Sequence, residues 1–325
     1  MMKTVAFSMA ICVTLATLAI SAQPPAQTGN GGSSTVRVLP VQRNITMLVG
    51  PNGNSAVQVG TDGVLLVDTQ DAAVAPQLFA AIRTLSDKPI QTIVYTSFHA
   101  QHTAGTEALM KLGAAAGGAQ PALRVIGHDN VLTRMSAGET PGTRSGASFR
   151  LNAAITVPVN SSYFTPTRDF FYNGEPIVLY YAPAAHTDGD TIVFFRGSDV
   201  VSTGDIFLPD LYPIIDVQNG GSVNGTIAAL NRVLELTVPA RFQEGGTYVI
   251  PGRGRLCDEA DVVEYRDMVT IVRDRVQDMV SRKMTLAQVK AARPSRDYDA
   301  EYGAASGAWT TDMFVEAVYR GVGGK

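Results

Sequence analysis

Cysteine is nearly absent from this chain of 325 residues, which holds only Cys12 and Cys257. Cys12 lies in an N-terminal segment that we expect to be removed, so the rest of the chain cannot form an intrachain disulfide. A single Cys257 is more typical of a small buried apolar residue than of a nucleophile. With 45% hydrophobic residues, the chain can bury a large core, as one big α/β domain or as two smaller ones.

An excess of basic residues is also missing. Lys and Arg number 26 against 29 Asp and Glu, a net charge of −3, and loss of Lys3 with the N-terminal segment makes the remainder one unit more negative. No basic stripe runs along any expected helix, which argues against nucleic acid as a partner. We expect a small-molecule substrate or ligand instead, and the sequence does not indicate an oligomeric state.

Long hydrophobic runs are confined to the N-terminus. Residues 5–20 are apolar or small, Ser21 and Ala22 end the run, and residues 23–25 (Gln-Pro-Pro) cannot continue a helix. This layout is typical of a secretory signal peptide over residues 1–22. An uncleaved membrane anchor is the alternative, although about 20 residues are needed to span a bilayer. We therefore expect an exported protein, periplasmic or secreted, with no membrane contact after cleavage.

The rest of the chain alternates strand-like and helical patterns. Residues 23–35, rich in Pro, Gly, Ser and Gln, predict a disordered linker, and residues 136–170 have no regular pattern. Both halves mix hairpin signals with strand–helix steps, which favours two mixed sheets packed face to face with helices outside over a doubly wound parallel sheet. Strands are expected at 35–41, 44–50, 55–60, 63–69, 90–96, 175–185, 190–197, 199–205 and 247–254. Residues 123–135 are expected to form a strand, a turn and a short helix, and further helices are expected at 72–85, up to 112, at 222–236 and from 258 onward.

Polar side chains follow several of the expected buried strands. Two of the four histidines, His99 and His102, share one turn after residues 90–96. His186 lies in "HTDGD", Asp205 ends "VVSTGD", and Arg253 lies in "IPGRG". Loops at strand ends that each deliver a polar group are typical of an enzyme site. We expect these five side chains to converge in one cleft.

These motifs resemble those of the metallo-β-lactamase-fold superfamily of metallohydrolases, in order, spacing and context. That family carries His-x-His-x-Asp-His after a buried strand, then a His in an "HT" turn, an Asp in a "GD" turn and a His in "PGHG". The resemblance implies an α/β fold of four layers, αββα, over residues 36–257. It also implies a C-terminal helical extension over residues 258–325 that packs on the domain.

Three motif positions depart from the family pattern. Ser97 replaces the first His, Gln101 replaces the Asp, and Arg253 replaces the final His. Arginine has no lone pair to give, so Arg253 cannot bind a metal, and we expect it to pair with Asp205 in place of a second cation. The resemblance then implies at most one zinc ion, or none, with His99, His186 and Asp205 as the first ion's ligands. As metal-binding residues it leaves His99, His102, His186 and Asp205, and as catalytic residues Asp205 and Arg253.

The resemblance implies a metal-dependent hydrolase of the ester, lactone, amide or phosphoester class. The alternative is a catalytically inactive pseudoenzyme or a ligand-binding protein on the same fold, in which the histidines are relics hydrogen-bonded in a polar pocket with no ion. We expect Asp188 and Asp190 to shape their turn and His128 to be structural. A serine nucleophile is disfavoured, because Ser97 and His99 alternate along an extended segment and no G-x-S-x-G motif is present.

Overall fold

The structure, a computed structural model, describes residues 35–117, 122–137 and 157–324. One of its two sheets has seven strands in chain order, antiparallel from β1 to β4 and parallel from β4 to β7. The turn sequence GPNGN, residues 50–54, lies between the second and third strands, which pair antiparallel as a hairpin. The strands are β1 (Arg37–Gln42), β2 (Ile45–Val49), β3 (Asn54–Gly60), β4 (Gly63–Val67), β5 (Ile90–Val94), β6 (Arg124–His128) and β7 (Ser161–Tyr163).

The second sheet has five strands, in the order β12-β11-β10-β9-β8. Its strands are antiparallel except for the parallel pair β11 and β12. They are β8 (Thr167–Tyr172), β9 (Glu175–Ala182), β10 (Asp190–Phe195), β11 (Val200–Gly204) and β12 (Tyr248–Pro251).

Helices connect the strands and form the C-terminal part. The 3-10 turn η1 (Ala72–Val74) leads into α1 (Ala75–Leu85), and η2 (Val217–Asn219) precedes α5 (Val223–Leu236). The other helices are α2 (Ala100–Thr103), α3 (Thr106–Ala115), α4 (Asp129–Ala137), α6 (Glu259–Ser281), α7 (Leu286–Ala292), α8 (Asp299–Tyr302) and α9 (Thr311–Gly321).

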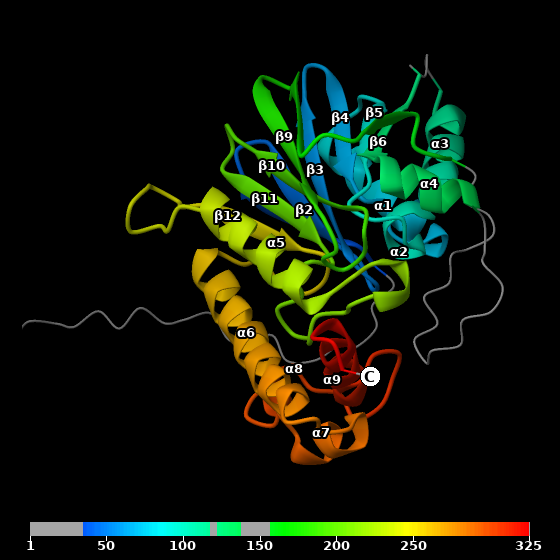
Figure 1. The fold of residues 1–325 in the computed structure, drawn as a ribbon. Helices are drawn as coiled ribbons and strands as arrows, with labels where there is room; N and C mark the ends of the chain where they lie inside the picture. Colours follow the sequence, from blue (N-terminus) through cyan, green and yellow to red (C-terminus); the bar gives the residue numbers. More distant parts are fainter. Residues whose placement is uncertain (1–34, 118–121, 138–156, 325) are drawn as a thin grey trace, which may run out of the picture. The chain divides into compact units, whose positions relative to one another are not determined.

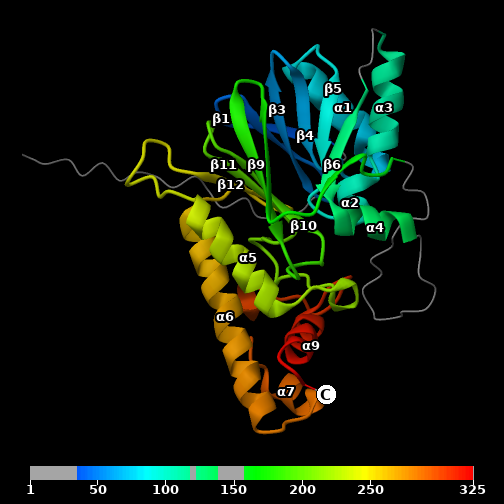
Figure 2. The same ribbon diagram turned by 45° about the horizontal axis from the view of Figure 1, so that its top comes forward.

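The two sheets pack face to face, with helices on the outer face of each. Met47, Leu65 and Val94 of the first sheet meet Leu179 and Phe195 of the second in one buried cluster. A second cluster joins the first sheet to α1 and α3, and a third joins the second sheet to α5, α6 and α9. Figures 1 and 2 show these layers from two directions. The predicted four-layer αββα arrangement is confirmed.

The C-terminal helices follow from their sequence pattern. One face of α6 is apolar and buried, including Val262, Met268 and Val272, because residues three and four apart share one side of a helix. Asp258 caps α6 with a capping box that includes Asp261, which satisfies amide groups that the helix itself leaves without partners. No helix within the described residues is long and apolar enough to cross a membrane.

The prediction of irregular structure over residues 136–170 was wrong in part. β7 and the first residues of β8 lie within it, whereas residues 138–156 lie outside the described part. β7 has only three residues, too few to display a period. β8 is an edge strand in which Phe171 is 69% exposed while Tyr172 is buried. Because an apolar side chain lies on its outer face, the sequence does not alternate between apolar and polar residues.

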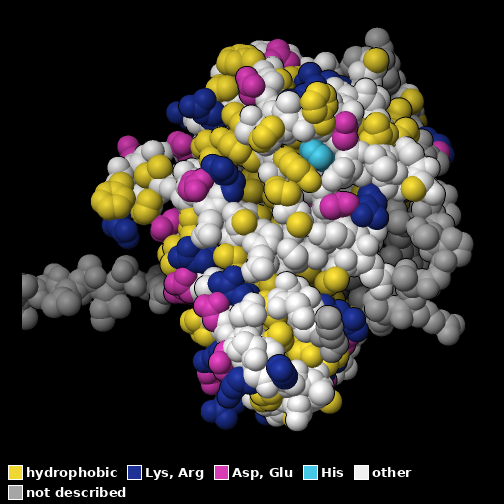
Figure 3. All heavy atoms as spheres, in the orientation of Figure 1, with side chains coloured by type: hydrophobic (Ala, Val, Ile, Leu, Met, Phe, Trp, Pro, Cys, Tyr) yellow, Lys and Arg dark blue, Asp and Glu magenta, His cyan; other side chains and the backbone are white. Residues whose placement is uncertain are grey.

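The topology brings several strand ends to one edge of the sandwich. In the first sheet β4 and β5 run parallel, so their carboxyl ends lie side by side. The same holds for β11 and β12 in the second sheet. The segment joining β9 to β10 lies at the same edge of the sandwich. On the face drawn in Figure 3, basic and acidic side chains are interspersed rather than segregated.

Candidate metal centre

His99 and His186 meet across the two sheets. His99 directly precedes α2 after the end of β5, and His186 lies between β9 and β10. His99 Nδ1 is 2.8 Å from His186 Nε2, and each residue is only 1% exposed. Burial lowers the pKa of the His99 imidazole to about 4, although the Asp216 carboxylate opposes the shift. The ring is therefore neutral near pH 7.

The other nitrogen of each ring is held by an acceptor. His186 Nδ1 lies 2.6 Å from the carbonyl oxygen of Ile214, which accepts only, so this nitrogen carries the proton. His99 Nε2 lies 3.0 Å from Asp216 Oδ2, and the pKa of that carboxyl is lowered by its hydrogen bond to His99, against burial. His99 Nε2 thus donates as well. The 2.8 Å contact between His99 Nδ1 and His186 Nε2 can therefore hold a proton, or a metal ion in the place of that proton.

His102 forms a second unit with Asp68. Asp68 follows β4 in the left-handed backbone region, with φ of 61°, and its carboxylate accepts from the Thr96 amide at 2.8 Å and from the Thr96 hydroxyl at 2.6 Å. His102 Nδ1 donates to Asp68 Oδ2 at 2.8 Å. Burial lowers the pKa of His102, but the Asp68 and Asp205 carboxylates outweigh it and raise the pKa to about 10. His102 is therefore an imidazolium.

Asp205 lies between the two histidine units. Its Oδ2 is 3.5 Å from His102 Nε2 and 4.0 Å from His186 Nε2. Gln101 Nε2 donates to the same oxygen at 3.2 Å. Burial raises the Asp205 pKa, but the charges of His102 and Arg253 hold it well below its usual range. Its Oδ1 is buried and has no hydrogen-bond partner among the described residues, so Asp205 is ionised and has one oxygen available.

Arg253 does not form the expected ion pair with Asp205. Within the described part of the chain it has no ion-pair partner, and its buried Nε has no hydrogen bond. The side chain is half-buried, and its charge still acts on Asp205. The glycine beside it explains why Asp205 is close: a Cβ on Gly252 would lie 2.2 Å from Asp205 Oδ1. Motif position predicted the neighbourhood of Arg253, but not the direction of its guanidinium.

Comparisons with known proteins identify the fold family. The sequence profile of the metallo-beta-lactamase superfamily matches residues 48–245, more than half of the chain. The chain belongs to this superfamily. The matched stretch contains Ser97, His99, His102, His186 and Asp205. Arg253 lies beyond it.

Solved structures of this fold resemble the chain at low sequence identity. One is a stereoselective inverting sec-alkylsulfatase from a Pseudomonas species, with a TM-score of 0.61, 14% identity, and coverage of 88% of this chain and 50% of that one. Another is a metallo-beta-lactamase from Pontibacter korlensis, with a TM-score of 0.55, 13% identity, and coverage of 73% and 99%. The chain thus spans about half the length of the alkylsulfatase. No curated protein matches the sequence.

Members of the superfamily usually bind zinc, which needs three or four nitrogen, sulfur or carboxylate ligands. As they stand, no three His, Cys, Asp or Glu side chains of the described residues are grouped so as to hold a metal ion. Spacing is one reason: two ligand atoms at about 2.0–2.1 Å from a tetrahedral zinc lie roughly 3.3 Å apart, against 2.8 Å between His99 and His186. The chemistry nevertheless fits one ion. Each ring nitrogen remote from the contact has the carboxylate or carbonyl acceptor typical of zinc-binding histidines.

The residues do not fit a second ion. The superfamily motif places His102, Gln101 and Arg253 around it. His102 carries a proton between two carboxylates, Gln101 is neutral, and Arg253 has no lone pair to give. Ser97 is also a departure from the motif, and its buried hydroxyl has no hydrogen-bond partner among the described residues.

Asp188, Asp190 and His128 each contact other residues of the protein. Asp190 accepts from the amide and the hydroxyl of Thr187, each at 2.7 Å, and so closes the turn after His186. Asp188 pairs with Arg134 of α4 at 2.7 Å. His128 Nδ1 accepts from the Asn130 amide at 3.2 Å at the start of α4.

Two carboxylates of the site were missed by sequence reasoning. Asp68 directly follows the buried strand β4, so the rule that found His99 and Asp205 at strand ends could have found it. Asp216 precedes η2, where it accepts from the Asn219 amide at 3.1 Å. No strand leads into it, and in the sequence it reads only as a turn residue.

Proposed function

We propose that this chain is a hydrolase of the metallo-β-lactamase superfamily that works with one zinc ion instead of two. His99 Nδ1, His186 Nε2 and the Asp205 carboxylate would hold the ion. The observation that carries the proposal is the 2.8 Å contact between His99 Nδ1 and His186 Nε2, with an acceptor held at the other nitrogen of each ring. A proton or a metal ion can bridge the two facing nitrogens, and burial lowers the pKa of His99 to about 4, so a proton is held weakly at neutral pH.

Protein cations take the place of the second ion. The His102 imidazolium, between Asp68 and Asp205, balances negative charge that a second zinc would otherwise balance. Arg253 adds a further positive charge that lowers the Asp205 pKa. Two fixed cations beside one carboxylate would repel a dication, which argues against a dinuclear centre.

The chain's own residues divide the remaining work. A zinc ion bound there would act as a Lewis acid and lower the pKa of water toward about 7. Asp205, ionised and with one oxygen that has no partner among the described residues, can accept a hydrogen bond from the attacking water and orient it. Arg253, half-buried and without a carboxylate partner among the described residues, can bind the developing oxyanion of an ester, lactone, amide or phosphoester. Asp216 and Ile214 hold the two rings in place.

The test is turnover that depends on both zinc and the histidine pair. A panel of chromogenic ester, lactone, amide and phosphoester substrates is assayed with the wild type, with His186→Ala and with the control His128→Gln, before and after chelation. The proposal predicts hydrolysis of at least one class that is lost on chelation and in His186→Ala but retained in His128→Gln. Turnover that survives chelation and His186→Ala contradicts it.

A ligand-binding protein without turnover is the second candidate. It is favoured by the pairing of His102 with two carboxylates, an arrangement that needs no ion, and by the near-complete burial of the site. Absence of both zinc binding and hydrolysis of any substrate class in the wild type would support this candidate over the first.

We propose further that the protein is exported, on the strength of the signal-like segment at residues 1–22. Expression of the full chain and of a chain that starts at residue 23 tests this. The full chain should reach the periplasm or medium with its N-terminus at residue 23, and the shortened chain should stay inside the cell. Cytoplasmic retention of both forms contradicts export.

A further inference from the structure

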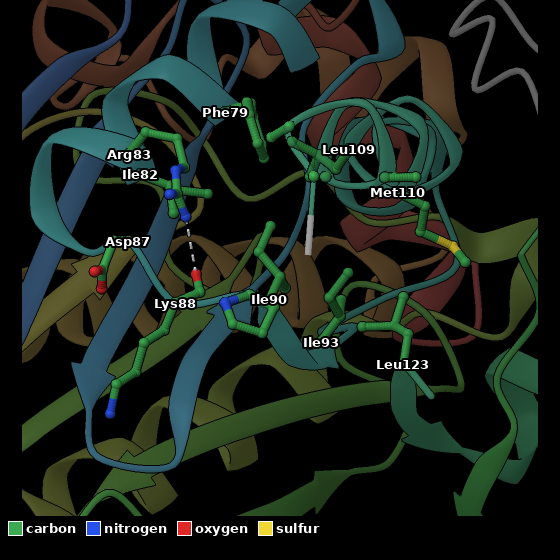
Figure 4. A pocket seen from close by; sticks show the side chains of 15 residues that line it. Phe79, Ile82, Arg83, Asp87, Lys88, Ile90, Ile93, Leu109, Met110 and Leu123 are labelled. Atoms are coloured by element: carbon green, nitrogen blue, oxygen red, sulfur yellow. Dashed lines mark hydrogen bonds between the residues drawn. The ribbon is translucent and has the colours of Figure 1, made fainter. Parts of the chain in front are cut away.

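A groove between α1, α3 and the amino end of β5 lies away from the histidines (Figure 4). Its apolar residues Ile82, Ile93 and Leu109 are each at most 2% exposed, so they pack inside the protein and offer a ligand no surface. His99 follows the opposite, carboxyl end of β5. At that end, the segment around Asp216 contacts both histidines of the proposed zinc site.

The turn that contains Asp216 is attached to both histidines. The Asp216 carboxylate accepts from His99 Nε2 at 3.0 Å. The Asp216 backbone amide donates to the His186 carbonyl at 2.9 Å. Two residues earlier, the Ile214 carbonyl accepts from His186 Nδ1 at 2.6 Å. One short segment, residues 214–216, therefore orients both rings, and a shift of this segment would change the 2.8 Å contact between them.

Asn219 holds the Asp216 carboxylate in place. Its side-chain Nδ2 donates to Asp216 Oδ2 at 2.6 Å, and this is the same oxygen that faces His99. The Asn219 backbone amide donates to Asp216 Oδ1 at 3.1 Å. Both carboxylate oxygens thus accept from Asn219, which fixes the plane of the carboxylate, and hydrogen bonds to a charged group are stronger than those between neutral groups. Loss of the side-chain bond would leave the carboxylate free to turn away from His99.

Arg134 of α4 determines which end of the Asn219 amide faces Asp216. Arg134 Nη1 donates to Asn219 Oδ1 at 2.9 Å. Because a guanidinium only donates, the amide oxygen faces Arg134 and the amide nitrogen faces Asp216. The other nitrogens of Arg134 donate to Asp188 at 2.7 Å and 3.3 Å, and the guanidinium carbon lies 6.0 Å from the centroid of the Phe98 ring. A continuous series of contacts therefore joins α4 to the histidine pair.

We propose that Asn219 is a positioning residue of the zinc site, oriented by Arg134 and acting through Asp216 on His99. The inference rests on the proposed function for the ion itself, whereas the orientation of the His99 ring is a property of the protein without an ion. When the acceptor at Nε2 is no longer fixed, either nitrogen of the ring can carry the proton. A His99 ring protonated at Nδ1 cannot bind an ion through that nitrogen, so zinc affinity falls.

The first measurement is zinc affinity, by competition with a zinc indicator, for the full chain as wild type, Asn219→Ala and Arg134→Met. The affinity should fall about three- to tenfold in Asn219→Ala and about two- to threefold in Arg134→Met. Both losses should be smaller than the loss in Asp216→Ala, because the carboxylate itself remains.

Asn231 and Arg266 provide matched controls on α5 and α6. Arg266 Nη1 donates to Asn231 Oδ1 at 2.7 Å, the same kind of bond as that between Arg134 and Asn219. The Arg266 side chain is 27% exposed and that of Arg134 is 31% exposed. Asn231→Ala and Arg266→Met therefore remove an equivalent bond elsewhere in the protein, and they should leave zinc affinity unchanged.

A double variant separates positioning from a general structural effect. In Asp216→Ala the carboxylate is absent, so Asn219 has nothing to position. Adding Asn219→Ala to Asp216→Ala should therefore cause no further loss of zinc affinity, since the two residues act in series. A loss that adds in full in the Asp216→Ala background would mean that Asn219 supports the loop independently of Asp216, and it would overturn the proposal.

The protein without zinc gives a second, independent readout. In NMR spectra of the ¹⁵N-labelled histidine rings, His99 should be a single tautomer with its proton on Nε2 in the wild type and in Asn231→Ala, and a mixture of tautomers in Asn219→Ala. If the wild type binds no zinc, the proposed function fails and these spectra alone decide the positioning role. A mixture in Asn219→Ala alone supports the proposal. Identical His99 signals in all three proteins, or equal zinc affinities of Asn219→Ala and Asn231→Ala, would overturn it.

Discussion

His99 Nδ1 and His186 Nε2 lie 2.8 Å apart although the other nitrogen of each ring already donates a proton, to Asp216 and to the Ile214 carbonyl respectively. Two buried lone pairs at this distance repel each other unless a cation lies between them. A proton and a zinc ion therefore compete for the position between the two nitrogens.

Zinc binding should weaken when protons compete. Burial lowers the pKa of His99 to about 4, so between pH 8 and about 6 the ring is neutral and the affinity should be nearly constant. As the pH falls toward 4 the ring becomes protonated and the zinc affinity should fall, approaching about tenfold per pH unit. Competition titration with a zinc indicator across this range measures it. An affinity that already falls steeply between pH 8 and 7 would show that another group binds the ion.

We expect Asp216 to affect zinc affinity only by orienting the His99 ring. In Asp216→Ala the ring loses the acceptor that orients it, and zinc affinity should drop by about 10–100-fold. Asp188→Ala is the matched control, because that carboxylate lies in the turn beside His186 but pairs with Arg134, and it should change the affinity less than about twofold. Equal losses in the two variants would mean that the loops simply unravel.

The His102 charge should stabilise the fold in a defined pH window. Asp68 and Asp205 outweigh burial and raise the pKa of His102 to about 10, above about 6.5 in the unfolded chain. Its contribution is therefore complete below about pH 6.5 and is lost as the pH rises through 10. Denaturant unfolding of wild type and His102→Gln should differ by roughly 3–5 kcal/mol at pH 6.5, and by progressively less toward pH 10. A difference that is independent of pH contradicts the imidazolium.

Gly252 should tolerate no side chain. A Cβ there would lie 2.2 Å from Asp205 Oδ1 and 2.7 Å from the Gly204 backbone, so Gly252→Ala should destabilise the protein by about 1–3 kcal/mol. Gly53→Ala, where the nearest atom is a carbonyl at 3.3 Å, should cost less. Thermal melts compare them. Equal melting temperatures for Gly252→Ala and wild type would mean that Asp205 is not held against this loop.

Most of the fold was predictable because periodicity and strand-end chemistry are local signals. The buried strands before His99 and Asp205 are plain in the sequence, and so is the apolar face of α6. β7 and β8 were missed, because a three-residue strand shows no period and an exposed Phe171 obscures the inward face of an edge strand.

The site was predictable in position but not in contacts. Motif order located His99, His102, His186 and Asp205, which come together. Motif order predicted an ion pair between Asp205 and Arg253, whereas the Asp205 carboxylate contacts His102 and Gln101. Side-chain direction depends on the packing of distant segments such as β4 and η2, which supply Asp68 and Asp216, and no local pattern encodes those approaches.

The number of zinc ions per chain tests the central claim most directly. The purified protein is dialysed to equilibrium against excess zinc at pH 7.5, and zinc is measured by elemental analysis. His186→Ala and the triple variant Ser97→His, Gln101→Asp, Arg253→His, which restores the superfamily motif, are measured alongside. The account predicts about one ion for the wild type, none for His186→Ala and two for the triple variant. Two ions in the wild type, or none, would contradict it.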